Sequence, residues 1–176
     1  MRALPSLLGQ PLRVEWASGL RNLNGRLEVG GARGTEVHAA SFVRERRMVF
    51  DEVLRRNRGE MIRILVHELF HFAWVRLSND LRDTWKQLLR QELVLHARGE
   101  LGWSAESRKC AFRSANADPF GLAWSQYCCE SYCDSAAWLY ADSGVHEEFT
   151  LAPRFREIRR AGLRTIESHR AGAIRI

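Results

Sequence analysis

Hydrophobic and polar residues alternate along the first third of the chain. Leu12, Val14 and Trp16 are separated by Arg13 and Glu15. A period of two is typical of a strand with one buried face. The pattern therefore predicts a strand that begins at about residue 12.

Further segments of this region are also expected to be extended. Asn24-Gly25 separates residues 20–23 from residues 26–29, and Asn-Gly is the strongest short signal for a hairpin because both turn positions need a positive φ. A third extended stretch, residues 36–43, is expected to continue through residues 47–50 after a charged bend. The N-terminal part is therefore expected to form a small antiparallel sheet.

From about residue 58 onward, hydrophobic residues recur at helical spacing. Asn57 and Glu60 resemble a capping box, and Pro153 stands where the first turn of a helix tolerates proline. Turns are expected at Gly99, Asp118-Pro119 and Ser143-Gly144. The helices expected between these signals span residues 58–77, 80–98, 104–112 and 122–141, with a last helix from about residue 153. A small sheet followed by helices is an α+β arrangement, and the length suits a single domain over residues 1–176.

Two of these helices have one apolar face. In the second helix the residues expected to face inward are Leu81, Trp85, Leu88 and Leu95. In the last helix they are Phe155, Ile158, Leu163 and Ile166. The arginines of the last helix are expected to form a solvated face; they are Arg154, Arg156, Arg159, Arg160 and Arg164.

Composition narrows the class of protein. Apolar residues make up 45% of the chain and charged residues 27%, which is typical of a globular domain. No apolar run approaches the roughly 18 residues of a membrane span, and the N-terminal residues form a poor secretory signal, so a cytoplasmic protein is expected. The net charge is +6, but the arginines are spread along the chain among acidic residues, so a nucleic-acid partner is not expected.

The spacing of the cysteines indicates neither a metal-binding motif nor a disulfide pattern. Cys110, Cys128, Cys129 and Cys133 form no CxxC pair, so neither a zinc ribbon nor a set of disulfides is indicated. We interpret them as small hydrophobic residues in a reducing compartment.

The strongest chemical signal is His67-Glu68-Leu69-Phe70-His71. The two histidines are four apart, so on a helix their rings stand on one face and can share one zinc ion. Zinc lowers the pKa of a bound water toward neutrality, and Glu68 is placed to accept a proton as that water attacks a carbonyl. This is the logic of the HExxH zinc proteases.

The alternative is a chance match to a short motif. The residues that surround the motif from Ile64 to Val75 are all apolar, which predicts a helix buried on most sides. Two imidazoles and a carboxylate buried there without partners would cost several kcal/mol. A bound metal removes that cost, and we favour the metal site.

A third ligand is expected from the helix over residues 122–141. Glu130 and Asp134 are four apart and are its only acidic residues. Glu130 can complete a His₂Glu set, and Asp134, one turn on, can reach the distal nitrogen of a motif histidine and fix its tautomer. The alternative is an ordinary polar stripe that faces solvent.

HExxH followed by ExxxD resembles the gluzincin clan, the thermolysin-like metallopeptidases. The resemblance implies a zincin-like fold, zinc ligands His67, His71 and Glu130, Glu68 as the base, and Asp134 as the residue that orients the first motif histidine. The stretch from Glu130 to Leu139 is also similar to the third-ligand helix of ImmA/IrrE-like regulatory peptidases.

The chain departs from the clan in two ways. The segment between His71 and Glu130 is much longer than in thermolysin-like proteins, so a helical hairpin at about residues 80–112 is expected to pack alongside the site. Cys129 stands where those proteins have an asparagine before the ligand glutamate.

We therefore expect a zinc metallopeptidase that cleaves a peptide or protein substrate. The alternative is a non-catalytic or regulatory zincin-fold protein that binds peptides or a protein partner. An edge strand, either residues 36–43 or residues 47–50, is expected to align the substrate. The residue that stabilises the oxyanion stays open among Tyr127, Tyr132, Tyr140 and His146.

Overall fold

The computed structural model describes residues 4–114, 118, 121–141, 144–169 and 172–176. The helices are α1 (Arg58–Val75), α2 (Asn79–Val94), α3 (Trp103–Ser114), α4 (Leu122–Tyr140) and α5 (Pro153–Ser168). The strands are β1 (Ser6–Leu8), β2 (Arg13–Ala17), β3 (Leu20–Leu23), β4 (Arg26–Val29), β5 (Thr35–Glu36), β6 (Ala39–Phe42), β7 (Arg47–Asp51) and β8 (Ala173–Arg175).

Small sheets followed by the helices α1 to α5 confirm the α+β class. The Pro119 and Ser143 turn predictions fall outside the described residues.

In the described part of the chain the strands form three small sheets, and their pairing is not uniformly antiparallel. β7 is the central strand of one sheet; β6 pairs with it antiparallel and β2 pairs with it parallel. β1 pairs in parallel with β8, which ties the N-terminal region to the C-terminal one. The expectation of a purely antiparallel sheet is therefore wrong, because strand pairs such as these join segments far apart in the sequence, and local turn signals do not report them.

The hairpin prediction is confirmed. β3 and β4 pair antiparallel with Leu23 opposite Arg26, which leaves Asn24 and Gly25 as the two-residue turn. Their φ angles are 52° and 81°, and a positive φ at both positions is the requirement of a type I′ turn.

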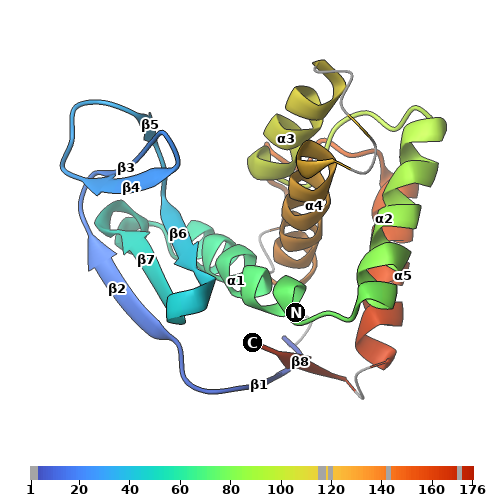
Figure 1. Ribbon diagram of the computed structural model, residues 1–176, viewed down its shortest axis with the longest axis horizontal. Coiled ribbons are helices and arrows are strands. Elements are labelled where there is room, and N and C mark those ends of the chain that lie inside the picture. The colour runs from blue at the N-terminus through green and yellow to red at the C-terminus, as the bar shows by residue number, and fades with distance from the viewer. Residues whose placement is uncertain (1–3, 115–117, 119–120, 142–143, 170–171) are drawn as a thin grey trace.

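Helix α1 lies between the strands and the other helices (Figure 1). Its N-terminus is capped as predicted, since Asn57 Oδ1 accepts a hydrogen bond from Glu60 N. Ile64 and Phe72 pack into a core with residues of β7, whereas Phe70 and Trp74 pack into a second core with α2, α4 and α5. A helix buried on two sides explains the apolar surroundings of the HExxH motif.

Two helices, α2 and α3, are present between the two motifs as expected, but they do not form the expected hairpin, because α3 packs mainly on α4 whereas α2 packs on α5 and α4. Trp85 and Leu89 of α2 are fully buried, whereas Leu95 lies beyond the end of α2 and is exposed. In α5, Phe155, Leu163 and Ile166 are buried as predicted. Ile158 is exposed instead.

Arg159 contradicts the prediction of a solvated arginine face on α5. Its side chain is 0% exposed, and its guanidinium donates a bidentate pair of 2.7 Å hydrogen bonds to the carboxylate of Glu92 on α2. It also reaches Glu100 at 3.2 Å and donates to the hydroxyls of Ser131 and Ser135 on α4. Helical periodicity could not reveal this arginine, because its partners come from other segments.

Glu100 joins two more groups to this buried network. It accepts hydrogen bonds from Lys109 Nζ of α3 at 2.9 Å and from the Tyr127 hydroxyl of α4 at 2.5 Å. The two carboxylates of Glu92 and Glu100 are thus matched by the two cations of Arg159 and Lys109. Although burial opposes ionisation of Glu100, these cations keep its pKa below the ordinary value.

No helix among the described residues combines the length and the apolar composition needed to cross a membrane.

Replacement of Arg159 is expected to destabilise the protein strongly. Arg159→Met fills a similar volume but leaves two buried carboxylates short of a cation, which costs about 3–5 kcal/mol. Arg154→Met, at an exposed position of the same helix, is expected to change the free energy of unfolding by no more than about 0.5 kcal/mol. Urea denaturation measures both; equal effects would contradict the proposed importance of the network.

The stability that Glu100 contributes is expected to depend on pH. Its folded-state pKa lies below its ordinary value of 4.5, so the contribution is complete above that pH and is lost as the pH falls toward the folded-state pKa. Glu100→Gln is therefore expected to be much less stable than the wild type at pH 7, with a gap that narrows in acid. Urea denaturation from about pH 7 to pH 3 checks this. The exposed Glu157→Gln serves as the control, and a gap that stays constant would refute the prediction.

Candidate metal centre

Helices α1 and α4 pack against each other and bring the predicted ligands to one point. The Nε2 atoms of His67 and His71 are 3.1 Å apart. Glu130 Oε2 lies 3.3 Å from the first and 3.7 Å from the second. Zinc with bonds of about 2.0–2.1 Å in a tetrahedral arrangement separates its ligand atoms by roughly 3.3 Å. The three side chains therefore fit one zinc ion.

Asp134 contacts His67 on the other side of the ring. Its Oδ1 lies 2.6 Å from Nδ1 of His67, so that Nδ1 carries the proton and Nε2 is left to face His71 and Glu130. Burial alone would lower the pKa of His67, but Asp134 and Glu130 outweigh it and raise this pKa well above the ordinary value. The predicted contact between Asp134 and the distal nitrogen of a motif histidine is thus present.

Asp134 is itself held by the start of α3. Its Oδ2 accepts a hydrogen bond from Ala105 N at 2.8 Å, in the first turn of the helix, where unpaired N–H groups favour a carboxylate. Gly102 lies so close that a Cβ built there would come within 2.3 Å of Asp134 Cγ. No local sequence pattern indicates Gly102 or Ala105, because both act across a tertiary contact.

The side chains of the centre carry buried charges of both signs. Burial by itself would raise the pKa of Glu130, yet the hydrogen bond with His67 and the charges of both histidines lower it to about 2. Burial would lower the pKa of His71, but Cys129 and Glu130 raise it to about 9. The Glu130 carboxylate and the two imidazoles therefore favour each other's charged forms.

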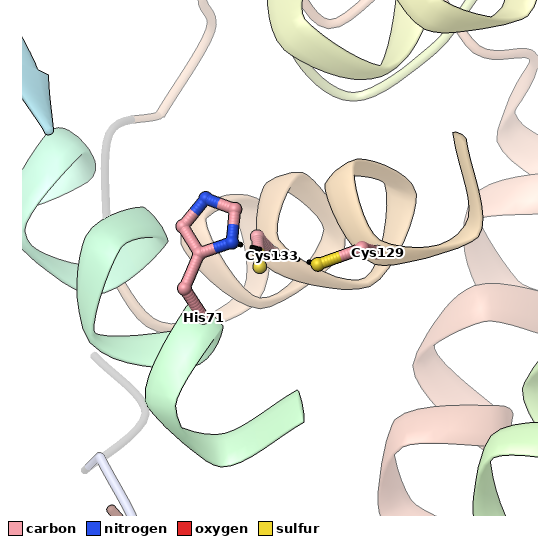
Figure 2. A group of neighbouring side chains, drawn as sticks. All are labelled: His71, Cys129 and Cys133. Atoms are coloured by element: carbon pink, nitrogen blue, oxygen red, sulfur yellow. Dashed lines mark hydrogen bonds between the residues drawn. The ribbon is translucent and has the colours of Figure 1, made fainter. Parts of the chain in front are cut away.

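The second nitrogen of His71 faces sulfur. Cys129 Sγ lies 3.5 Å from His71 Nδ1, and Cys133 follows one turn later on α4 (Figure 2). The hydrogen bond from Cys133 lowers the pKa of Cys129, burial opposes this, and His71 lowers it further, to about 6. Burial and the neighbouring Cys129 raise the pKa of Cys133 well above the ordinary value. Interpreting all the cysteines as simple core residues missed this cluster.

Glu68 lies beside the three proposed ligands. One carboxylate oxygen of Glu68 and one ring nitrogen from each of His67 and His71 are within 4.8 Å of one another. The backbone carbonyl of Glu68 accepts a 3.0 Å hydrogen bond from Ser41 Oγ of β6. Glu68 is therefore near the centre without being needed to complete it.

A cavity of about 320 Å³ opens on His67 and Glu68. One wall comes from residues 35–39, and another from Trp103 and Ser104 at the start of α3. The cavity offers a space in which a substrate can reach Glu68.

Arg63 forms part of the cavity wall, one turn before His67. Its guanidinium pairs with Glu60 on its own helix and with Glu148, and Glu148 also accepts a hydrogen bond from Trp103 N at 2.8 Å. Arg63 was not anticipated, although its spacing of four from His67 places both on one helix face.

None of the four candidate oxyanion donors lines this cavity. The Tyr127 hydroxyl is bonded to Glu100, Tyr132 packs between Phe70 and Trp85, and His146 Nε2 faces Glu60 at 3.2 Å. Tyr140 stacks on Phe70. Outside the proposed metal ligands, the residues with side-chain donors that do line the cavity are Thr35, His38, Arg63, Trp103 and Ser104.

The two candidate edge strands are now distinguished. Residues 47–50 belong to β7, which is paired on both sides, with β2 and with β6. β6, within residues 36–43, is an edge strand of that sheet and contacts α1. Of the two candidates, β6 is therefore the one whose outer edge has no strand partner among the described residues.

No family model, no curated protein and no solved structure matches the chain. The chemistry of the centre is therefore inferred from its own geometry.

Asp134→Asn is expected to weaken zinc binding. Asp134 accepts hydrogen bonds from two N–H groups, His67 Nδ1 and Ala105 N, whereas an asparagine has one accepting oxygen and an NH₂ group that meets one of these donors unfavourably. The zinc dissociation constant should rise about 10- to 100-fold. Competition with a chromophoric chelator measures it. The surface variant Asp83→Asn should bind zinc like the wild type, and unchanged affinity in Asp134→Asn would rule out the orienting role.

Proposed function

We propose that the protein is a zinc-dependent metallopeptidase. The observation that carries the proposal is the convergence of His67 Nε2, His71 Nε2 and Glu130 Oε2 within 3.7 Å of one another, with Glu68 adjacent. A purely structural zinc site needs only ligands and usually has four from the protein. Three ligands beside a carboxylate and a cavity favour catalysis.

The chain's own residues divide the chemistry among them. When bound, zinc supplies Lewis acidity for hydrolysis of a carbonyl compound. His67, His71 and Glu130 hold the ion, and Asp134 keeps the Nδ1 proton on His67. Glu68 accepts a proton from the attacking water and can deliver it to the leaving amine.

Arg63 supports the polar wall of the cavity. Its guanidinium donates at 3.0 Å to Glu148, which also accepts from Trp103 N. These contacts join α1 to the start of α3 and fix this part of the cavity wall.

The proposed substrate is an extended peptide segment. β6 offers a free edge next to α1, and main-chain hydrogen bonds to such an edge can align a peptide without regard to most of its side chains. Thr35 to Ala39 lead from the cavity wall into β6. We place the activity in the cytoplasm, since free thiols beside the centre suit a reducing compartment.

Glu68→Gln is expected to separate zinc binding from catalysis. The wild type should contain about one zinc per chain; His67→Ala should lose it, and Glu68→Gln should retain it. Hydrolysis of an unbiased peptide library should fall at least about 100-fold in Glu68→Gln, because a general base contributes about 10²–10⁴-fold. The measurements are elemental analysis and mass spectrometry of the digested library.

The control is Glu157→Gln, which changes an exposed glutamate on α5 and should retain full activity. Cleavage that persists unchanged in Glu68→Gln would refute Glu68 as the base. A zinc-loaded wild type that binds peptides of the library but cleaves none would favour the non-catalytic alternative.

A further inference from the structure

The side of His71 that faces away from Glu130 forms a cluster with two cysteines. One ring nitrogen of His71, Cys129 Sγ and Cys133 Sγ all lie within 4.8 Å of one another, and the nitrogen that contacts Cys129 is Nδ1. Figure 2 shows the ring of His71 on α1 turned toward the two sulfurs, which stand on successive turns of α4. All three thiols of the nearby segment, Cys128 included, are free.

The distances suit a shared metal ion. Bonds of about 2.3 Å to sulfur and about 2.0–2.1 Å to nitrogen in a tetrahedral arrangement separate the two atoms by roughly 3.5 Å. Cys129 Sγ and His71 Nδ1 are 3.5 Å apart. A small movement of either side chain would accommodate an ion that also reaches Cys133.

We propose that His71 Nδ1, Cys129 and Cys133 form a second metal site, one that takes a thiophilic ion such as Cd²⁺ or Cu⁺. Sulfur ligands select soft ions, whereas the two imidazoles and the carboxylate of the first centre suit zinc. Binding releases the thiol protons to solvent and forms one metal–sulfur bond to each cysteine. This site goes beyond the proposed peptidase and does not depend on it.

The two sites share one ring. His71 Nε2 belongs to the centre with His67 and Glu130, while Nδ1 belongs to the cysteine cluster. A neutral imidazole offers only one nitrogen lone pair, because the other nitrogen carries the proton. A thiophilic ion at Nδ1 therefore removes one of the three ligands of zinc, and the two ions compete.

A metal ion from solvent can reach the site, and two other cysteines of the chain serve as controls. Cys129 and His71 are half-buried, and Cys133 is fully buried behind them. Cys128 is next to Cys129 in sequence but is not part of the cluster, and Cys110 is exposed on α3. Variants of Cys110 and Cys128 thus test for binding to any thiol of the chain.

The test is a titration of the full-length, metal-free, reduced protein with Cd²⁺, followed by the ultraviolet thiolate-to-cadmium charge-transfer band. The band should saturate at one ion per chain. Loss of a residue that only hydrogen-bonds to a metal ligand lowers metal affinity about 10- to 100-fold. Loss of a ligand itself, in Cys129→Ser or Cys133→Ser, should therefore raise the Cd²⁺ dissociation constant at least about tenfold. Cys110→Ser and Cys128→Ser should keep the wild-type band.

Glu130→Gln separates this proposal from the peptidase proposal, since it should weaken zinc while leaving the cadmium band intact. Prior loading with Cd²⁺ should weaken zinc binding to the wild type at least about tenfold. Circular dichroism checks that the variants are folded. If the buried Cys133→Ser variant does not fold, the half-buried Cys129→Ser variant alone tests whether the cysteines bind Cd²⁺. Absence of the band, or a band unchanged in Cys129→Ser, would overturn the second site whatever the peptidase activity proves to be.

Discussion

The register of α1 against α4 is the constraint on which the candidate centre depends. His67 and His71 are one turn apart on α1, and Glu130 and Asp134 are one turn apart on α4, so a single alignment brings all four together. A slip of one turn, about 5.4 Å, would separate Glu130 from at least one histidine. Phe70 and Trp74 of α1 both pack on the ring of Tyr132 of α4, and these large contacts hold the register.

A neighbouring face of α4 is held by buried charge. Arg159 donates to the hydroxyls of Ser131 and Ser135, which directly follow Glu130 and Asp134 in the sequence. Through Glu92 and Glu100 the same guanidinium links α5 to α2 and to the segment before α3. Buried ion pairs add little stability compared with apolar packing of the same volume. We therefore interpret the network mainly as a device that fixes the position of α4 among its neighbours.

The sequence was informative wherever its signal was local. The Asn24-Gly25 turn, the Asn57 cap and the spacing of His67 and His71 are each decided within a few residues, and the structure contains all of them. Glu130 and Asp134 could be inferred because two carboxylates in an apolar helix need partners, and the structure places both beside the histidines. Their spacing matches that of the histidines, which made the pairing predictable.

Other features required contacts that no local pattern encodes. The parallel pairing of β2 with β7, the burial of Arg159 and the approach of Gly102 to Asp134 all join segments that are distant in the sequence. The role of Cys129 was missed for a related reason: it is adjacent to Glu130 and therefore reaches a different nitrogen of His71, which becomes visible only once the two helices are docked.

X-ray absorption at the zinc edge of the purified, zinc-loaded protein tests the metal centre most directly. A centre built from His67, His71 and Glu130 predicts a first shell of nitrogen and oxygen alone, at about 2.0–2.2 Å, with the outer scattering of two imidazole rings. Sulfur at about 2.3 Å in that shell would show that zinc binds the cysteine cluster instead, and would contradict the assignment of Glu130 as the third ligand.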